Sequence, residues 1–164
     1  MAKLTPAKTP LSLTTSLAFP KAFKELIQKY ESRHRYYITF SIEIIPDLKH
    51  SKNLSISQQK EKEGQLILNN INATDRLFLL DEKGKDYDSI EFSKFLQKQM
   101  NSGLKQMVLA IGGPYGFSEL VYKSAHGKIS FSKMTFSHQM IRLFVVEQLY
   151  RGMSILKNEP YHHQ

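Results

Sequence analysis

The sequence predicts an α/β fold in which one domain contains a mainly parallel sheet flanked by helices. Segments with the two-residue period of strands alternate with segments of helical spacing, which is the pattern of βαβ units. The 164 residues are enough for one core but few for two. The chain has no cysteine and no apolar run of membrane-spanning length, which excludes disulfide frameworks, thiolate zinc sites and a membrane span.

The first regular elements are a helix, a strand and a second helix. Pro20 suits the first turn of a helix, because its fixed φ matches that position. Residues 38–44 alternate apolar and polar side chains, as a half-buried strand does, and Pro46 ends the pattern. Ser55 and Gln58 have the spacing of a capping box, which predicts that a helix begins there.

The middle of the chain continues the alternation. Residues 76–80 form a short apolar strand, and the polar residues 81–84 that follow are predicted to turn. Ser89 is a suitable cap for a helix that Gly103 stops. Residues 107–111 are apolar throughout, as in a strand buried on both faces.

The last third predicts two capped helices around a short strand. Ser118 begins a short helix, and Ser137 begins a long final one. Between them we expect a brief strand at 129–131 and a loop at 134–136.

Residues 1–24 carry lysines but no acid, and they contain three prolines. The prolines and the absence of arginine argue against a transit peptide, and no apolar core of a secretory signal follows the first lysine. We interpret this segment as an irregular or weakly stranded start.

The chain is basic, with a formal net charge of +8 and an isoelectric point near 9.6. The positive charge is concentrated toward both ends of the chain. This distribution favours a polyanionic partner such as RNA, although lysine-rich surfaces also serve solubility alone. The charged stretch 49–63 is interpreted as a solvated loop and helix face.

Residues 111–116, Ile-Gly-Gly-Pro-Tyr-Gly, are the strongest local motif. Three glycines after a buried strand let the backbone approach a ligand closely, and ligands bind at this end of the strands in open α/β sheets. The pattern is neither a dinucleotide fingerprint nor a P-loop. The alternative is a tight connection between strand and helix.

Among the histidines, His138 is the candidate for chemistry. It follows the Ser137 cap, where the helix dipole opposes protonation and favours a neutral imidazole; the alternative is a surface histidine. Arg142 and Arg151 lie on the same helix and are expected to point to opposite sides.

Three of the other histidines are not expected to act in a site. Polar neighbours place His34, His50 and His126 at the surface. His162 and His163 at the end of the chain cannot form a zinc site without further ligands, and we expect no metal.

Five ordered motifs together resemble the SPOUT, or α/β-knot, methyltransferases. The resemblance is to the family that methylates N3 of a pseudouridine in large-subunit ribosomal RNA. The motifs are Leu-Leu-Asp at 79–81, the glycine motif at 111–116, Ser-His-x-x-x-Arg at 137–142, Glu-Gln-Leu-Tyr-Arg at 147–151 and Asn-Glu-Pro-Tyr-His at 158–162.

The resemblance implies one SPOUT domain over 1–164, with a deep trefoil knot at about 107–157. It also implies a homodimer that binds S-adenosylmethionine in the knot. Carried over by motif, the cofactor residues are Leu80, Gly112, Phe131, Ser132, Lys133, Met134, Thr135 and Phe136.

For catalysis, the hypothesis assigns proton removal to His138 or His162. Arg142 would stabilise the developing uracil anion and Tyr161 would orient the base, with the partner's tail completing the site. The residues expected to contact RNA are Arg142, Arg151, Tyr161 and His162.

The implied substrate is ribosomal RNA in the large subunit or the assembled ribosome, and the implied location is the cytoplasm. The alternatives are a non-catalytic RNA- or ribosome-binding protein and a SPOUT enzyme that acts on transfer RNA. Residues 1–19 depart from the family, whose first strand is not interrupted by proline. We therefore expect that strand to be distorted, shortened or displaced to an edge.

Overall fold

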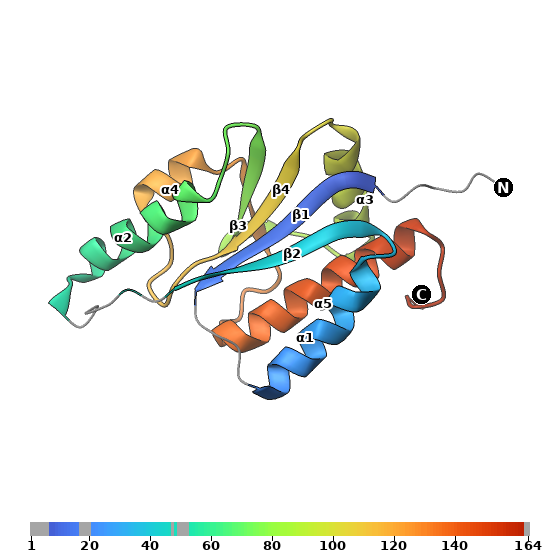
Figure 1. Cartoon of the computed structure of the whole chain (residues 1–164), viewed down its shortest axis with the longest axis horizontal. Helices are drawn as coiled ribbons and strands as arrows, with labels where there is room; N and C mark the ends of the chain where they lie inside the picture. The colour runs from blue at the N-terminus through green and yellow to red at the C-terminus, as the bar shows by residue number, and fades with distance from the viewer. Residues whose placement is uncertain (1–6, 17–20, 47, 49–52, 163–164) are drawn as a thin grey trace.

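The computed structural model describes residues 7–16, 21–46, 48 and 53–162 (Figure 1). Strands and helices alternate along this part of the chain, as predicted. In chain order they are β1 (Ala7–Ser16), α1 (Lys21–His34), β2 (Ile38–Ile45), α2 (Ile56–Asn69), β3 (Asp75–Asp86), α3 (Ser89–Asn101), β4 (Gln106–Ile111), α4 (Glu119–Ser124), β5 (Gly127–Ser130) and α5 (His138–Leu156).

The five strands form one sheet in the order β2-β1-β4-β3-β5. All four neighbouring pairs are parallel. This confirms the predicted α/β class and its parallel sheet. The knot implied for about 107–157 stays a prediction.

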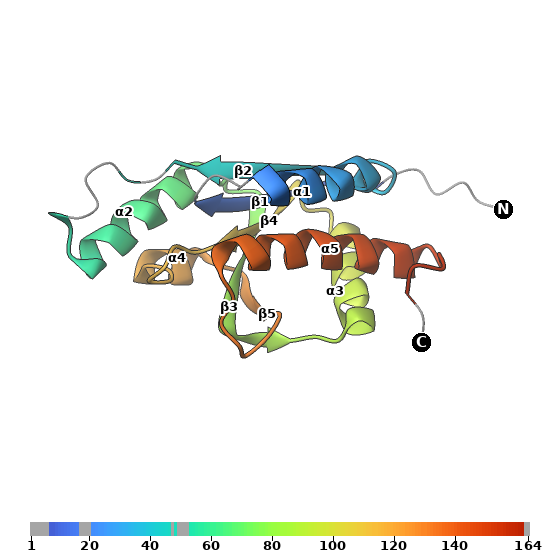
Figure 2. The ribbon, with the colours of Figure 1, turned by 90° about the horizontal axis from the view of Figure 1, so that it is seen from below.

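Helices cover both faces of the sheet, and β4 shows how its residues divide between them. Met107, Leu109 and Ile111 pack with α1, α3 and α5, whereas Val108 and Ala110 pack with α2 and α4. Figure 2 shows α5 running beside α1 and α3, with α2 and α4 grouped apart from them. Because both faces of β4 are buried from Met107 onward, residues 107–111 are all apolar.

The first strand is interior, so the expected displacement to an edge is wrong. β1 lies between β2 and β4, and its Leu11 and Leu13 are buried in the core. The expected distortion is present, because the register with β2 shifts between Ala7 and Leu11. Pro10 falls in this shift, where its missing N–H does least harm to the ladder. Pro20 and residues 1–6 lie outside the described residues.

Two local predictions in the middle of the chain are wrong. Residues 81–84 do not form a turn but continue β3, whose register with β5 shifts between Leu80 and Lys85. The third helix is capped by Asp88 rather than Ser89, and Glu91 completes a capping box. The caps at Ser55, Ser118 and Ser137 are confirmed.

His34 is not a surface residue, as the sequence suggested, but is completely buried. His126 is exposed, as predicted, and its Nδ1 accepts a hydrogen bond from the backbone N–H of Leu77 (3.2 Å). His50 and His163 lie outside the described residues. No helix of the described segments has the length and apolar character needed to cross a membrane.

Candidate functional site

A cleft of about 410 Å³ lies at the carboxyl ends of β4 and β5 and beside the middle of β3. All of the predicted cofactor residues except Lys133 line it. Lys133 is exposed and instead forms an ion pair with Asp86 (3.8 Å). The volume is in the range of sites for small molecules.

The glycine motif forms one wall of this cleft. Its backbone closes a tight loop, in which the N–H of Gly116 donates to the carbonyl of Gly113 (3.0 Å). Gly113 has a packing reason to be glycine, because a Cβ there would collide with the carboxylate of Glu63 in α2. The loop is therefore both a wall of the cleft and a close contact with α2.

Asp81 adds a carboxylate to the lining of the cleft. Its Oδ2 accepts a hydrogen bond from the Tyr122 hydroxyl (2.6 Å), and its Oδ1 accepts one from the backbone N–H of Lys83 (2.8 Å). Burial raises the pKa of Asp81, but these hydrogen bonds and the charges of Lys128 and Lys83 outweigh it, so the pKa is lowered. Burial and Asp81 raise the pKa of Tyr122 to about 12. A negative charge therefore lies in the cleft at neutral pH.

His138 lines the same cleft from the first turn of α5. Burial and the positive charge of Arg142 lower its pKa, partly offset by the negative charge of Glu63. The imidazole is therefore neutral at pH 7, as the sequence predicted. The largest cause is burial, and the charge of Arg142 is the next.

Arg142 is fully buried one turn further along α5. Full burial disfavours the predicted direct contact with RNA. The positive charge of Arg142 acts on His138 instead and lowers the pKa of its imidazole.

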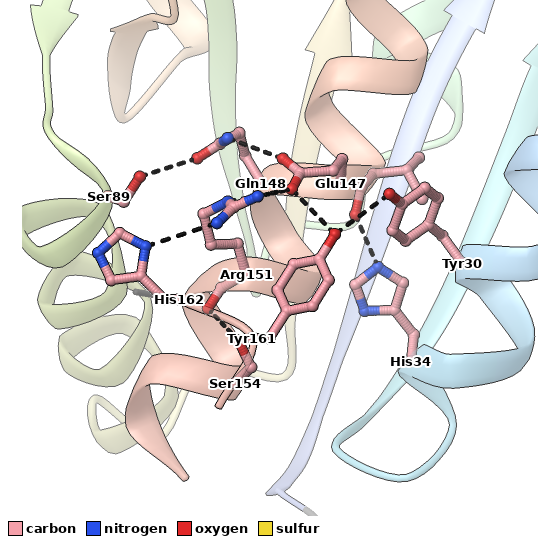
Figure 3. A network of polar contacts seen from close by, with 10 residues as sticks. Tyr30, His34, Ser89, Glu147, Gln148, Arg151, Ser154, Tyr161 and His162 are labelled. Atoms are coloured by element: carbon pink, nitrogen blue, oxygen red, sulfur yellow. Dashed lines mark hydrogen bonds and ion pairs between the residues drawn. The ribbon is translucent and has the colours of Figure 1, made fainter. Parts of the chain in front are cut away.

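A second polar cluster joins the middle of α5 to the residues that follow the helix and is centred on Glu147 (Figure 3). Glu147 Oε1 accepts hydrogen bonds from Arg151 Nε (3.0 Å) and from the Tyr161 hydroxyl (3.2 Å). The Arg151 guanidinium lies over the Tyr161 ring, 4.8 Å from its centroid. His162 Nδ1 is 3.5 Å from Arg151 Nη1. We call Glu147, Arg151, Tyr161 and His162 the tail cluster.

The structure thus separates the predicted catalytic residues into two groups. His138 and Arg142 lie at the cleft, whereas Tyr161 and His162 belong to the tail cluster. At about 1.5 Å per residue, the thirteen steps from His138 to Arg151 span about 20 Å of helix. One chain alone does not bring the two groups together.

Comparison with known proteins identifies the family. The family described as "Predicted SPOUT methyltransferase" matches residues 14–162. The chain belongs to the SPOUT methyltransferase family.

Curated SPOUT relatives are similar over most of the chain. One from Flavobacterium johnsoniae is 64% identical over 144 residues, covering 88% of this chain and 92% of the relative. One from Flavobacterium psychrophilum is 63% identical with the same coverage. One from Parabacteroides distasonis is 59% identical, covering 87% of this chain and 90% of the relative. All three are named "Ribosomal RNA large subunit methyltransferase H".

The cleft fits the methyl donor of SPOUT methyltransferases, S-adenosylmethionine. Leu80, Ile129 and Phe136 offer apolar surface for an adenine ring, and the loop at 111–116 offers backbone groups. Asp81 supplies a carboxylate suited to a cationic or hydroxyl-bearing group. The groups that line the cleft thus suit a cofactor that is partly apolar and partly charged.

Sequence reasoning missed Asp81, Tyr122 and Glu63. Asp81 stood in the quoted Leu-Leu-Asp motif, so its position after a buried strand was an available signal. Tyr122 gave no signal, because its bond to Asp81 joins residues 41 positions apart. Glu63 was assigned to a solvated face, yet it is half-buried.

Proposed function

We propose that this protein transfers a methyl group from S-adenosylmethionine to N3 of a pseudouridine in large-subunit ribosomal RNA. The observation that carries the proposal is the cleft itself, where separate family motifs meet around a neutral histidine. The names of the curated relatives support the class of substrate.

The cofactor would be held by the residues of the cleft walls. Leu80 and Phe136 would pack on the adenine, and the backbone around Gly112 would bind its polar edge. Asp81, already oriented by Tyr122 and the Lys83 N–H, would accept hydrogen bonds from the cationic or hydroxyl-bearing part. Ser132, Met134, Thr135 and Phe131 complete the wall.

The methyl group on a sulfonium is electrophilic when the cofactor binds, and the C–S electrons remain on the sulfur after transfer. The protein must position the target nitrogen and remove its proton. The neutral imidazole of His138 accepts the N3 proton. Arg142 supplies nearby positive charge while the uracil ring is anionic.

The tail cluster completes the site in a homodimer. Tyr161 and His162 are held against α5 by Glu147 and Arg151, which lie further along the helix than His138. A twofold arrangement brings the tail of one subunit to the cleft of the other. Tyr161 then orients the target base, and Arg151 and His162 contact RNA.

The net charge of +8 suits a ribosomal substrate. We propose that the large subunit or the assembled ribosome, rather than free RNA, supplies the shape that a single small domain recognises. Such a substrate implies a cytoplasmic location.

The decisive experiment adds the protein and S-adenosylmethionine to ribosomes from a strain that lacks this activity. Mass spectrometry of the RNA nucleosides should find N3-methylated pseudouridine in large-subunit RNA. His138→Ala should abolish the product, whereas Lys133→Ala, which changes an exposed side chain outside the cleft, should not. If the protein methylates transfer RNA and not ribosomal RNA, the proposed substrate is wrong. Absence of cofactor binding by calorimetry would indicate a non-catalytic binding protein.

A further inference from the structure

Glu63 is a carboxylate behind the glycine loop of the cleft. It lies on α2, and its Oε1 accepts a hydrogen bond from Gln59 Nε2 (2.8 Å). Its Oε2 is buried and has no hydrogen-bond partner among the described residues. A buried carboxylate oxygen without a partner is costly, so its retention in this place requires an explanation.

The contact with Gly113 shows where this carboxylate is directed. Any Cβ at Gly113 would collide with it, so only glycine lets Glu63 approach the loop this closely. Gly113 lines the main cleft on one side and, on the other, a small cavity that Glu63 also lines. The thickness of one glycine backbone therefore separates Glu63 from the cleft.

His138 lies in that cleft, and its ring has a comparable buried nitrogen. Its Nδ1 is buried, and the described part of the chain offers it no hydrogen-bond partner. The charged groups that act on it are Arg142 from α5 and Glu63 from α2. Arg142 and burial lower the pKa of the imidazole, and Glu63 opposes them by raising it. Without the charge of Glu63, burial and the charge of Arg142 would both disfavour the protonated imidazole of His138.

We propose that Glu63 is a positioning residue that stabilises the protonated imidazole of His138 across the Gly113 backbone. The proposal rests on the proposed function, in which His138 is the base. The N3–H bond breaks, its proton bonds to the imidazole, and its electron pair stays on N3 as the nucleophile. The imidazolium formed is then balanced by the Glu63 carboxylate, and its proton later passes to solvent.

The first test needs neither cofactor nor RNA. The imidazole of His138 is titrated by NMR in the folded protein, with its signal assigned by its loss in His138→Gln. Glu63→Gln should move the midpoint to lower pH, because a negative charge is removed with little change of shape. Gly113→Ala should move it in the same direction, because the added Cβ displaces the carboxylate. Glu61→Gln is the control, since Glu61 is exposed on the same helix, and it should leave the midpoint unchanged.

The second test follows methyl transfer. Glu63→Gln should lower kcat by about 10-fold, as expected when a general base is weakened, with KM for cofactor and ribosome unchanged. The acidic limb of the pH profile should move to lower pH, which a merely structural role would not do. An unchanged NMR midpoint in Glu63→Gln overturns the proposal, and so does a shifted midpoint with normal kcat. If the wild-type protein methylates no ribosomal RNA, the proposed function fails, while the titration still shows whether the two residues are coupled.

Discussion

His34 is a titratable side chain in the middle of the apolar packing. Its ring lies against Phe40, with centroids 4.7 Å apart, and its Nε2 is 3.0 Å from the carbonyl oxygen of Val146. Burial lowers the pKa of His34 to about 4, although the Val146 hydrogen bond partly opposes this. Its polar neighbours in sequence concealed the burial. The helical spacing does indicate this burial, because His34 lies two turns after buried Ile27, on the same face of α1.

This burial predicts acid sensitivity. The unfolded chain binds a proton at His34 near the ordinary pKa of 6.5, whereas the folded chain does so only near 4. Stability from this group is therefore present above 6.5 and lost as the pH falls to about 4, by roughly 3 kcal/mol at most. Urea unfolding across this range should show a smaller loss in His34→Gln than in the wild type. The variant His162→Gln should behave like the wild type, and equal slopes for His34→Gln and wild type would contradict the assignment.

Asp81 and Asp86 provide a matched pair on β3. Asp81 lines the cleft, whereas Asp86 pairs with exposed Lys133. Asp81→Asn should raise the Kd for S-adenosylmethionine by about 10-fold, which is the scale of losing a charge-assisted hydrogen bond. Asp86→Asn should leave it unchanged. Calorimetry measures both, and an equal effect of the two substitutions would remove Asp81 from the cofactor site.

At the scale of elements, the sequence predicted helix caps better than the length of strands. Caps such as Ser55 and Ser137 act on neighbouring backbone groups, so their signal is local and was correct. β3 continues beyond its apolar residues because, after Leu80, it pairs with β5 and no longer with β4. Residues there are polar and line the cleft or face solvent, so no apolar alternation marks the strand. Only the pairing partner, which sequence does not show, keeps them extended.

Gly84 is the residue that permits this extension. A Cβ at Gly84 would lie 2.6 Å from the backbone of Ile129, and a backbone atom cannot move aside as a side chain can. Gly84→Ala should therefore destabilise the protein by about 2 kcal/mol or more and weaken cofactor binding, because β5 leads into the loop at 131–136.

Gly103→Ala is the comparison for this substitution. It has no atom within 4 Å but a positive φ of 71°, so the expected cost is about 1 kcal/mol with normal cofactor binding. Chemical unfolding and calorimetry measure both variants. A loss in Gly84→Ala no larger than that in Gly103→Ala would contradict the close approach of β3 and β5.

At the scale of the whole molecule, α5 joins the cleft to the tail cluster and holds them apart. The sequence motifs contain residues of both groups, but spacing along the chain did not reveal their separation. Only the straight path of α5 over 19 residues does so. In the proposed function, a second copy of the chain completes the site.

Mixing two inactive variants tests this arrangement. His138→Ala removes the base, and deletion of 160–164 removes Tyr161 and His162. In a mixed dimer, the intact cleft of one subunit receives the intact tail of the other. With random exchange half of the dimers are mixed and each has one complete site, so about a quarter of wild-type activity should return. No recovery after verified exchange, measured by methyl transfer to ribosomes, would show that each subunit works alone.

The place of β4 in the sheet also matters for the growing chain. β4 is the fourth strand to be synthesised, yet its neighbours are the first and the third. Until Gln106–Ile111 has emerged, β1 and β3 each keep an open edge, and open edges invite pairing with other chains. Folding must wait for the strand that fits between them, which makes it slow relative to folds with local pairing. The period of translation before β4 appears is thus when this protein is most exposed to aggregation.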